Sequence, residues 1–218
     1  MILSLNELEA TLLKAARGAG MPWGLAEEAA TAGRWLAERR LDVATPFLSL
    51  FEALPMPANP VWDGACLKPA DPCAWLCPIM AGSFLSDIAC DFSVTFERVL
   101  CPILMVPFAD RAAFADRKAA AIEMVWEGLR LRLDGSDLAL VAGKIARLST
   151  IRADRMVIDR AATATDGKAP MSFSPSCTEV EIELDLFARL QAFEALNSVP
   201  ASERSRVLGA GAGDSDND

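Results

Sequence analysis

The chain has 218 residues, of which 52% are hydrophobic and 23% are charged, and its formal net charge is −9. This balance supplies enough apolar surface to offset chain entropy, so it excludes a globally disordered chain. The negative charge would repel a phosphate backbone, so we expect no nucleic-acid partner. The sequence has no histidine, which excludes Ser-His-Asp and Cys-His catalysis and imidazole metal ligands.

The longest apolar run without a charge, residues 72–86, contains two prolines and a glycine. It is shorter than the roughly 20 residues that a helix needs to cross a bilayer. The first ten residues, "MILSLNELEA", lack the basic region of a signal peptide. We therefore expect no membrane partner, no export and a cytoplasmic location.

The first 55 residues predict a small helical unit. Ser4 and Glu7 have the spacing of a capping box, and leucines and alanines follow at helical intervals. Gly18 fits the left-handed position that ends a helix. A second helix is expected at about residues 25–40 and a third at about 46–54, before the proline-rich connector "PMPANP".

The middle of the chain predicts strands. "DFSVTFERV" alternates apolar and polar residues, which is typical of a half-buried strand, and "RMVIDRA" indicates another. "CPILMVPF" is a continuous apolar run, which favours a strand buried on both faces. Between Ile122 and Leu133 the alternation changes phase at Gly128, which indicates a β-bulge. A hairpin turn is expected at Asp134 and Gly135.

The last 40 residues predict a strand followed by helices. Val180, Ile182 and Leu184 alternate, so "TEVEIELDLFARLQAFEAL" begins as a strand. It continues as a helix to about Leu196, with Asp185 as its cap. A short helix is expected around "PASERSRVL", and the tail "GAGAGDSDND" has no apolar periodicity.

These elements together predict an α+β fold. An N-terminal helical subdomain (1–55) is expected to pack on a mostly antiparallel, β-rich α+β core (60–208) with C-terminal helices. A glycine and aspartate tail (209–218) follows. We expect these parts to form one compact unit.

The six cysteines lie mostly in apolar surroundings, so we expect free, buried thiols. Cys73 and Cys77 have the spacing of one zinc knuckle, with Cys66 and Cys90 as further candidates. Lys68 is close enough in sequence to activate Cys66 as a nucleophile. Because a second knuckle and histidine are missing, we expect no metal and no cofactor.

Two blocks of the sequence carry a resemblance, "SLNELEATLLKAARGAGMPWGLAEEA" and "VPASERSRVLGAGAGDSDND". In these blocks the chain resembles a family of uncharacterised proteobacterial proteins, a domain-of-unknown-function family. The likeness spans nearly the whole chain, and Asp214 and Ser215 depart from the apolar residue and hydroxyl expected there. The resemblance implies no activity, cofactor or substrate, so it assigns no catalytic residue.

The stretch "ARGAGMPWGLAEEA" joins the first two expected helices. Gly18 and Gly20 could let backbone N–H groups approach an anion, with the dipole of the second helix adding to the attraction. Against this, the stretch is neither G-x-G-x-x-G nor a Walker loop, and Glu27 and Glu28 would repel a phosphate. The alternative is a connector between two helices with Trp23 packed in its crevice.

The C-terminal block adds hydroxyl and guanidinium groups, which suit a carboxylate or a phosphate. The alternative is a capped surface helix with a flexible tail. The candidate ligand-binding residues are Arg17, Trp23, Ser202, Arg204, Ser205 and Arg206.

The sequence leaves two functions open. One is a non-catalytic accessory or interaction subunit, which forms a homo-oligomer or binds a protein partner. The other is a binding protein or enzyme for a small anionic ligand, with its site where the N-terminal hinge meets the C-terminal block. Whether the chain is an enzyme stays open, because no recognised catalytic motif is present.

Overall fold

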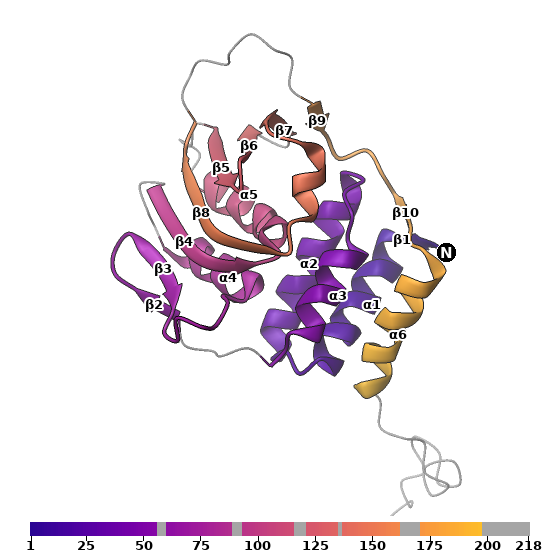
Figure 1. The fold of residues 1–218 in the computed structure, drawn as a ribbon. Coiled ribbons are helices and arrows are strands. Elements are labelled where there is room, and N and C mark those ends of the chain that lie inside the picture. The colour runs from indigo at the N-terminus through magenta and orange to yellow at the C-terminus, as the bar shows by residue number, and fades with distance from the viewer. Residues whose placement is uncertain (56–59, 89–92, 116–120, 135–136, 162–170, 198–218) are drawn as a thin grey trace, which may run out of the picture.

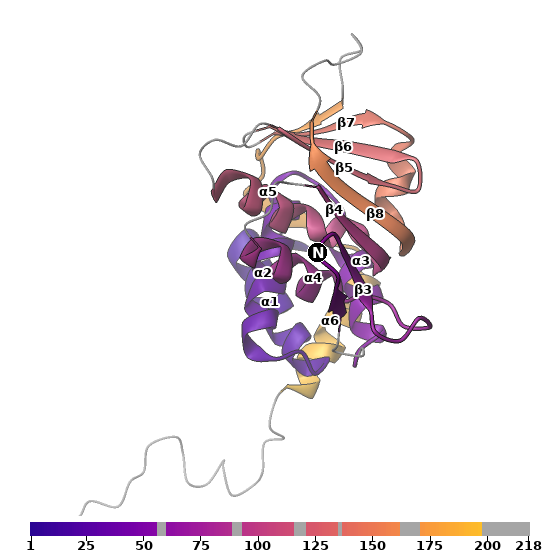
Figure 2. The same ribbon diagram turned by 90° about the vertical axis from the view of Figure 1, so that its left-hand side faces the viewer.

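The structure, a computed structural model, describes residues 1–55, 60–88, 93–115, 121–134, 137–161 and 171–197. Its α+β architecture confirms the predicted fold class. A large sheet forms one layer, and α4 and α5 lie between this sheet and a layer made of the remaining helices (Figures 1 and 2). The helices are α1 (Leu5–Gly18), α2 (Trp23–Glu38), α3 (Ala44–Glu52), α4 (Pro78–Asp87), α5 (Val106–Ala115) and α6 (Leu184–Leu196), with short 3-10 helices η1 (Pro102–Met105) and η2 (Ile145–Ser149).

The described strands form one sheet of eight and one of two. The larger sheet has the order β2-β3-β4-β8-β5-β6-β7-β9 and is antiparallel except where β3 meets β4. One of its faces is buried, because alternate residues such as Phe96, Met124 and Ile158 point toward the helices. The strands are β1 (Ile2–Ser4), β2 (Pro60–Trp62), β3 (Cys66–Pro69), β4 (Ser93–Leu100), β5 (Ile122–Trp126), β6 (Leu129–Asp134), β7 (Asp137–Ala142), β8 (Arg152–Arg160), β9 (Met171–Phe173) and β10 (Glu179–Glu181).

The first helix begins as its sequence predicts. The Ser4 side chain accepts the N–H of Glu7, and the Glu7 carboxylate accepts the N–H of Ser4 at 2.8 Å. The bond from the Ser4 N–H, and a second one that the Ser4 hydroxyl donates to the same carboxylate at 2.8 Å, hold the pKa of Glu7 below its usual value. The left-handed position at the end of α1 belongs to Gly20, with φ at +92°, because Gly18 is still helical.

Strand β1 pairs with β10, so the N-terminus lies beside a strand from the last part of the described chain (Figure 1). The α-amino group of Met1 donates to the carbonyl of Ile182 at 2.7 Å, and the N–H of Ile182 donates to the carbonyl of Met1 at 2.9 Å. Helix α6 then runs along α1 so closely that a Cβ added at Gly18 would lie 1.7 Å from the Phe193 carbonyl oxygen. The C-terminal strand and helix therefore complete the N-terminal helical layer.

Two local predictions in the middle of the chain are wrong. The run from Cys101 to Phe108 is not a strand, because residues 102–108 form η1 and the start of α5. Each of these helices has a proline near its start, Pro102 and Pro107, where proline is favoured. The phase change at Gly128 is a hairpin rather than a bulge. Glu127 and Gly128 both have positive φ, at 44° and 74°, and connect β5 to β6 as a two-residue turn.

The other boundaries shift by about two residues. Helices α2 and α3 each begin and end two residues before their expected limits, and Glu183 rather than Asp185 precedes α6. Strands β6 and β7 pair as the hairpin prediction requires. The predicted last helix around "PASERSRVL" and the tail lie outside the described residues.

No helix in the described part of the chain is long and apolar enough to cross a membrane.

Candidate functional site

The predicted N-terminal hinge connects the packed helices α1 and α2, as one interpretation of its sequence requires, but Trp23 is placed differently. Trp23 is the first residue of α2 and is 58% exposed, so it is not packed in a crevice. Arg17 Nη1 donates to the carbonyl of Met21 at 2.6 Å, and the guanidinium lies 5.9 Å from the centroid of the Trp23 ring. The two predicted site residues on this side therefore contact each other at the surface.

The remaining predicted ligands, Ser202, Arg204, Ser205 and Arg206, lie outside the described residues. The helix that precedes them in the chain is described: α6 ends at Leu196, beside the last turn of α1. The backbone N–H of Asn197 would lie 3.3 Å from a Cβ added at Gly18. The chain therefore leaves α6 next to the hinge that holds Arg17.

The described cysteines are free, and they differ in exposure. Cys77 and Cys101 are buried, and burial raises the pKa of both thiols, that of Cys101 to about 12. Cys73 is exposed rather than buried. Burial also raises the pKa of Cys66, and the nearby Glu97 and Asp63 add to this effect, which opposes a nucleophilic thiolate there.

No three cysteine, aspartate or glutamate side chains in the described ranges gather closely enough to hold a metal ion. Cys90, the fourth candidate, lies outside those ranges.

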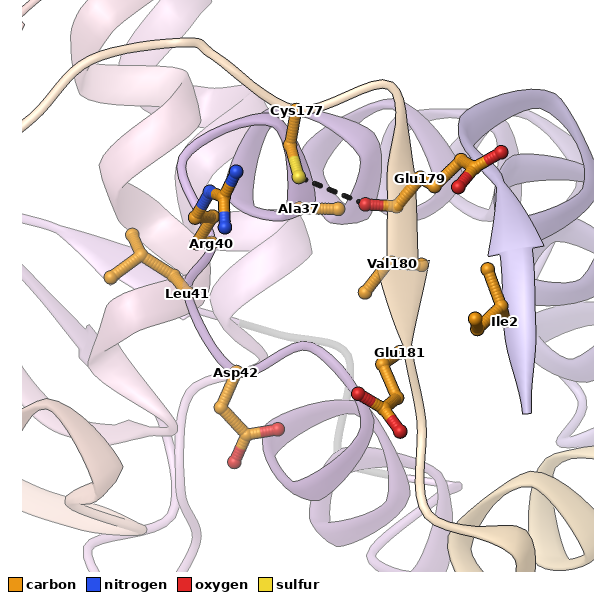
Figure 3. A pocket seen from close by; sticks show the side chains of 9 residues that line it. All are labelled: Ile2, Ala37, Arg40, Leu41, Asp42, Cys177, Glu179, Val180 and Glu181. Carbon is orange, nitrogen blue, oxygen red and sulfur yellow. Dashed lines mark hydrogen bonds between the residues drawn. The ribbon is translucent and has the colours of Figure 1, made fainter.

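A cleft that contains none of the predicted site residues lies between the end of α2 and strand β10 (Figure 3). Its volume is about 550 Å³. Its lining comes from β1, the end of α2 and the segment around β10, and consists of Ile2, Ala37, Arg40, Leu41, Asp42, Cys177, Glu179, Val180 and Glu181.

The first wall of the cleft is the reversal of the chain at the end of α2. Arg40 has a φ of +57°, a left-handed conformation that normally favours glycine. Its N–H donates to the carbonyl of Ala37 at 2.9 Å, and the N–H of Leu41 donates to that of Leu36 at 3.1 Å. These bonds bury Leu41 and leave the side chains of Arg40 and Asp42 exposed in the cleft.

The second wall is fixed to the first by backbone hydrogen bonds. The N–H groups of Ser176 and Cys177 donate to the carbonyl of Glu38, at 2.9 and 3.2 Å. Cys177 Sγ then donates to the carbonyl of Glu179 at 2.9 Å, on the cleft side of β10 (Figure 3). The end of α2 therefore positions β10.

A charged cluster holds the end of α2 against α5. The guanidinium of Arg39, which is 5% exposed, lies 3.5 Å from the Trp35 ring centroid. Trp35 Nε1 donates to Asp110 Oδ2 on α5 at 2.8 Å. Burial lowers the pKa of Arg39, against the attraction of Asp110, Glu38 and Asp137. Burial raises the pKa of Asp110, which Trp35 and Arg39 oppose.

The cleft is acidic on balance. Among its described lining residues, the carboxylates of Asp42, Glu179 and Glu181 outnumber the single guanidinium of Arg40. An adjoining cavity of about 300 Å³ continues along the same loop and strand and adds Glu183. One signal in the sequence could have pointed here, since glutamates at 179, 181 and 183 alternate and so share one face of an extended chain.

No curated protein and no solved structure matches the chain. A protein family matches the first part of the chain. The matched range contains the "SLNELEA" block of the expected resemblance and the first wall of the cleft, but neither β10 nor the C-terminal block. Residues 3–92 match the family described as Protein of unknown function (DUF3726).

Proposed function

We propose that this protein is a non-catalytic interaction subunit that binds a protein partner through the cleft between α2 and β10. The observation that carries the proposal is the composition of this cleft. It combines an excess of carboxylates with apolar side chains from Ile2, Leu41 and Val180. A charged rim around apolar contacts is the usual composition of a protein interface.

Exposed apolar side chains continue beyond the cleft at the same end of the molecule. Ile2 lines the cleft and is 64% exposed. The α-amino group of Met1 is hydrogen-bonded to the carbonyl of Ile182, and Leu184 follows two residues after Ile182 at the start of α6. The side chains of Met1 and Leu184 are exposed as well. Apolar side chains that are exposed near one another mark interaction sites more often than isolated apolar residues do.

Site-specific photo-crosslinking in cells tests the proposal. A benzophenone side chain at position 2, where Ile2 lines the cleft, should capture one protein species of fixed mass. The same group at Asp154, an exposed position on β8, is the matched control. Capture at position 2 should disappear when Asp42 is changed to Lys. Equal capture from both positions, or capture that ignores Asp42→Lys, would refute the proposal, and the product mass distinguishes a second copy from another protein.

A second function is favoured by the position of α6. Because this helix ends beside the hinge, Ser202, Arg204, Ser205 and Arg206 follow within ten residues of it. We propose as the alternative that these groups and Arg17 bind a small anion next to Trp23. Citrate and inorganic phosphate are the probes, and deletion of residues 209–218 is the test. Thermal stabilisation by either probe that survives the deletion unchanged would argue against a site closed by the tail.

A further inference from the structure

The backbone of β10 has one edge turned toward β1 and one turned toward the cleft. Residues 178, 180 and 182 lie on the β1 side, as shown by the bond from Leu5 N–H to the Thr178 carbonyl at 3.2 Å and by the paired bonds of Ile182 with Met1. In an antiparallel pair, the intervening residues turn their N–H and C=O groups away from the partner strand. The backbone groups of Glu179 and Glu181 therefore point away from β1.

The outward direction leads into the cleft. The carbonyl of Glu179 lies on the side of Ala37 and Cys177, where it accepts from the thiol (Figure 3). Among the described strands β10 pairs with β1 and with no other, so no described strand occupies this edge. The cleft and its adjoining cavity follow the edge from Cys177 to Glu183, which is about 20 Å at the rise of an extended chain.

The charges at this edge select one kind of occupant. The side chains of Glu179 and Glu181 leave the same face of β10, because they are two residues apart. A strand added at the edge would place alternate side chains directly opposite them. Lysine or arginine at those positions would complement both glutamates, and Asp42 on the other wall adds a third carboxylate.

We propose that β10 binds an extended segment of a partner protein by antiparallel strand addition, with basic residues at alternate positions of that segment. This inference rests on the proposed interaction function and names its partner chemistry. The two lysine or arginine residues of the segment exchange backbone hydrogen bonds with Glu179 and Glu181. The residue between them points to the opposite face, together with Val180.

Peptide binding to the full chain tests this mode directly. The probe is a fluorescein-labelled Val-Lys-Val-Lys-Val peptide with blocked ends, measured by anisotropy at low salt. N-methylation of the backbone nitrogens of both lysines removes the N–H donors that face β10 and should weaken binding at least tenfold. N-methylation of the central valine is the matched control, because that nitrogen faces away from β10, and it should change binding less than threefold.

Variants of the protein test the charge pattern. Glu181→Lys should abolish binding of the lysine peptide, whereas Asp154→Lys on β8 should leave it unchanged. A Val-Glu-Val-Glu-Val peptide should not bind. The inference is overturned if no peptide binds to the wild-type chain, if both methylated peptides bind alike, or if the acidic peptide binds as well as the basic one. Crosslinking of a partner from position 2 together with a failed peptide assay would keep the interaction function and reject strand addition.

Discussion

Replacing Gly18 with alanine should separate α6 from α1. A Cβ at this position would lie 1.7 Å from the carbonyl oxygen and 2.7 Å from the carbonyl carbon of Phe193. Both are backbone atoms, so no side-chain rotation relieves the overlap. To restore a separation of 3.0 Å, α6 must retreat by about 1.3 Å. The retreat also disturbs the edge-to-face contact of Phe193 with Phe51 of α3, whose ring centroids are 5.6 Å apart.

The size of the effect follows from two opposing contributions. Overpacking of this kind costs about 1–3 kcal/mol. Alanine instead of glycine in a helix contributes up to about 1 kcal/mol of stability. Gly24 of α2 isolates the second contribution, because a Cβ there would meet no atom within 4 Å. We therefore expect Gly18→Ala to be less stable than Gly24→Ala by about 2 kcal/mol.

Urea unfolding followed by circular dichroism at 25 °C measures the free energy of unfolding of both variants. Amide hydrogen exchange locates the effect, which should appear as faster exchange in residues 184–197 of Gly18→Ala alone. If Gly18→Ala is as stable as Gly24→Ala, the close approach of the two helices does not exist and the reasoning is refuted.

Three further variants test features near the two candidate sites. Arg40→Gly should be more stable than Arg40→Ala by about 1 kcal/mol in urea unfolding, because both lose the guanidinium but only glycine relieves the left-handed backbone; equal stabilities would contradict this. Because burial raises the pKa of Asp110 in the folded protein, protonation of this carboxyl stabilises the folded state relative to the unfolded state. The stability of the wild type relative to Asp110→Asn should therefore be greatest below about pH 4 and fall as the pH rises through the raised pKa. If the urea midpoints of the two proteins keep a constant difference from pH 3.5 to 7, this pH dependence is ruled out. Trp23→Ala should lower the unfolding free energy by less than about 1 kcal/mol, since the ring is largely exposed and loses only its contact with Arg17; a larger loss would show that Trp23 is a packing residue.

Local chemistry made several elements of the fold predictable. The capping box of Ser4 and Glu7 needs only residues three apart, and the alternation in β4 needs only its own sequence. The run from Cys101 to Phe108 could not be assigned in this way, since a segment buried on all sides has no periodicity that separates strand from helix. Its two prolines, which are favoured near the start of a helix, indicated the observed structure better than its hydrophobicity did.

The cleft was not predictable from any one segment. Arg40 and Asp42 resemble the solvated end of a helix, and Glu179 and Glu181 resemble an exposed strand. They form a site because two backbone bonds to the carbonyl of Glu38 bring residues 176 and 177 to the end of α2. Such pairing between distant parts of the chain depends on the tertiary fold, which a sequence pattern does not contain.

The pairing of β1 with β10 has a consequence for how the chain is made. Met1 and Ile182 are 181 residues apart, so at ribosomal rates of roughly 5–20 residues per second β10 is synthesised roughly 9 to 36 s after β1. During this interval α1 can dock against α2, but its face toward α6 is still open to water or to a chaperone. Helix α1, although it is synthesised before α6, is therefore among the last of the described helices to acquire all its native neighbours.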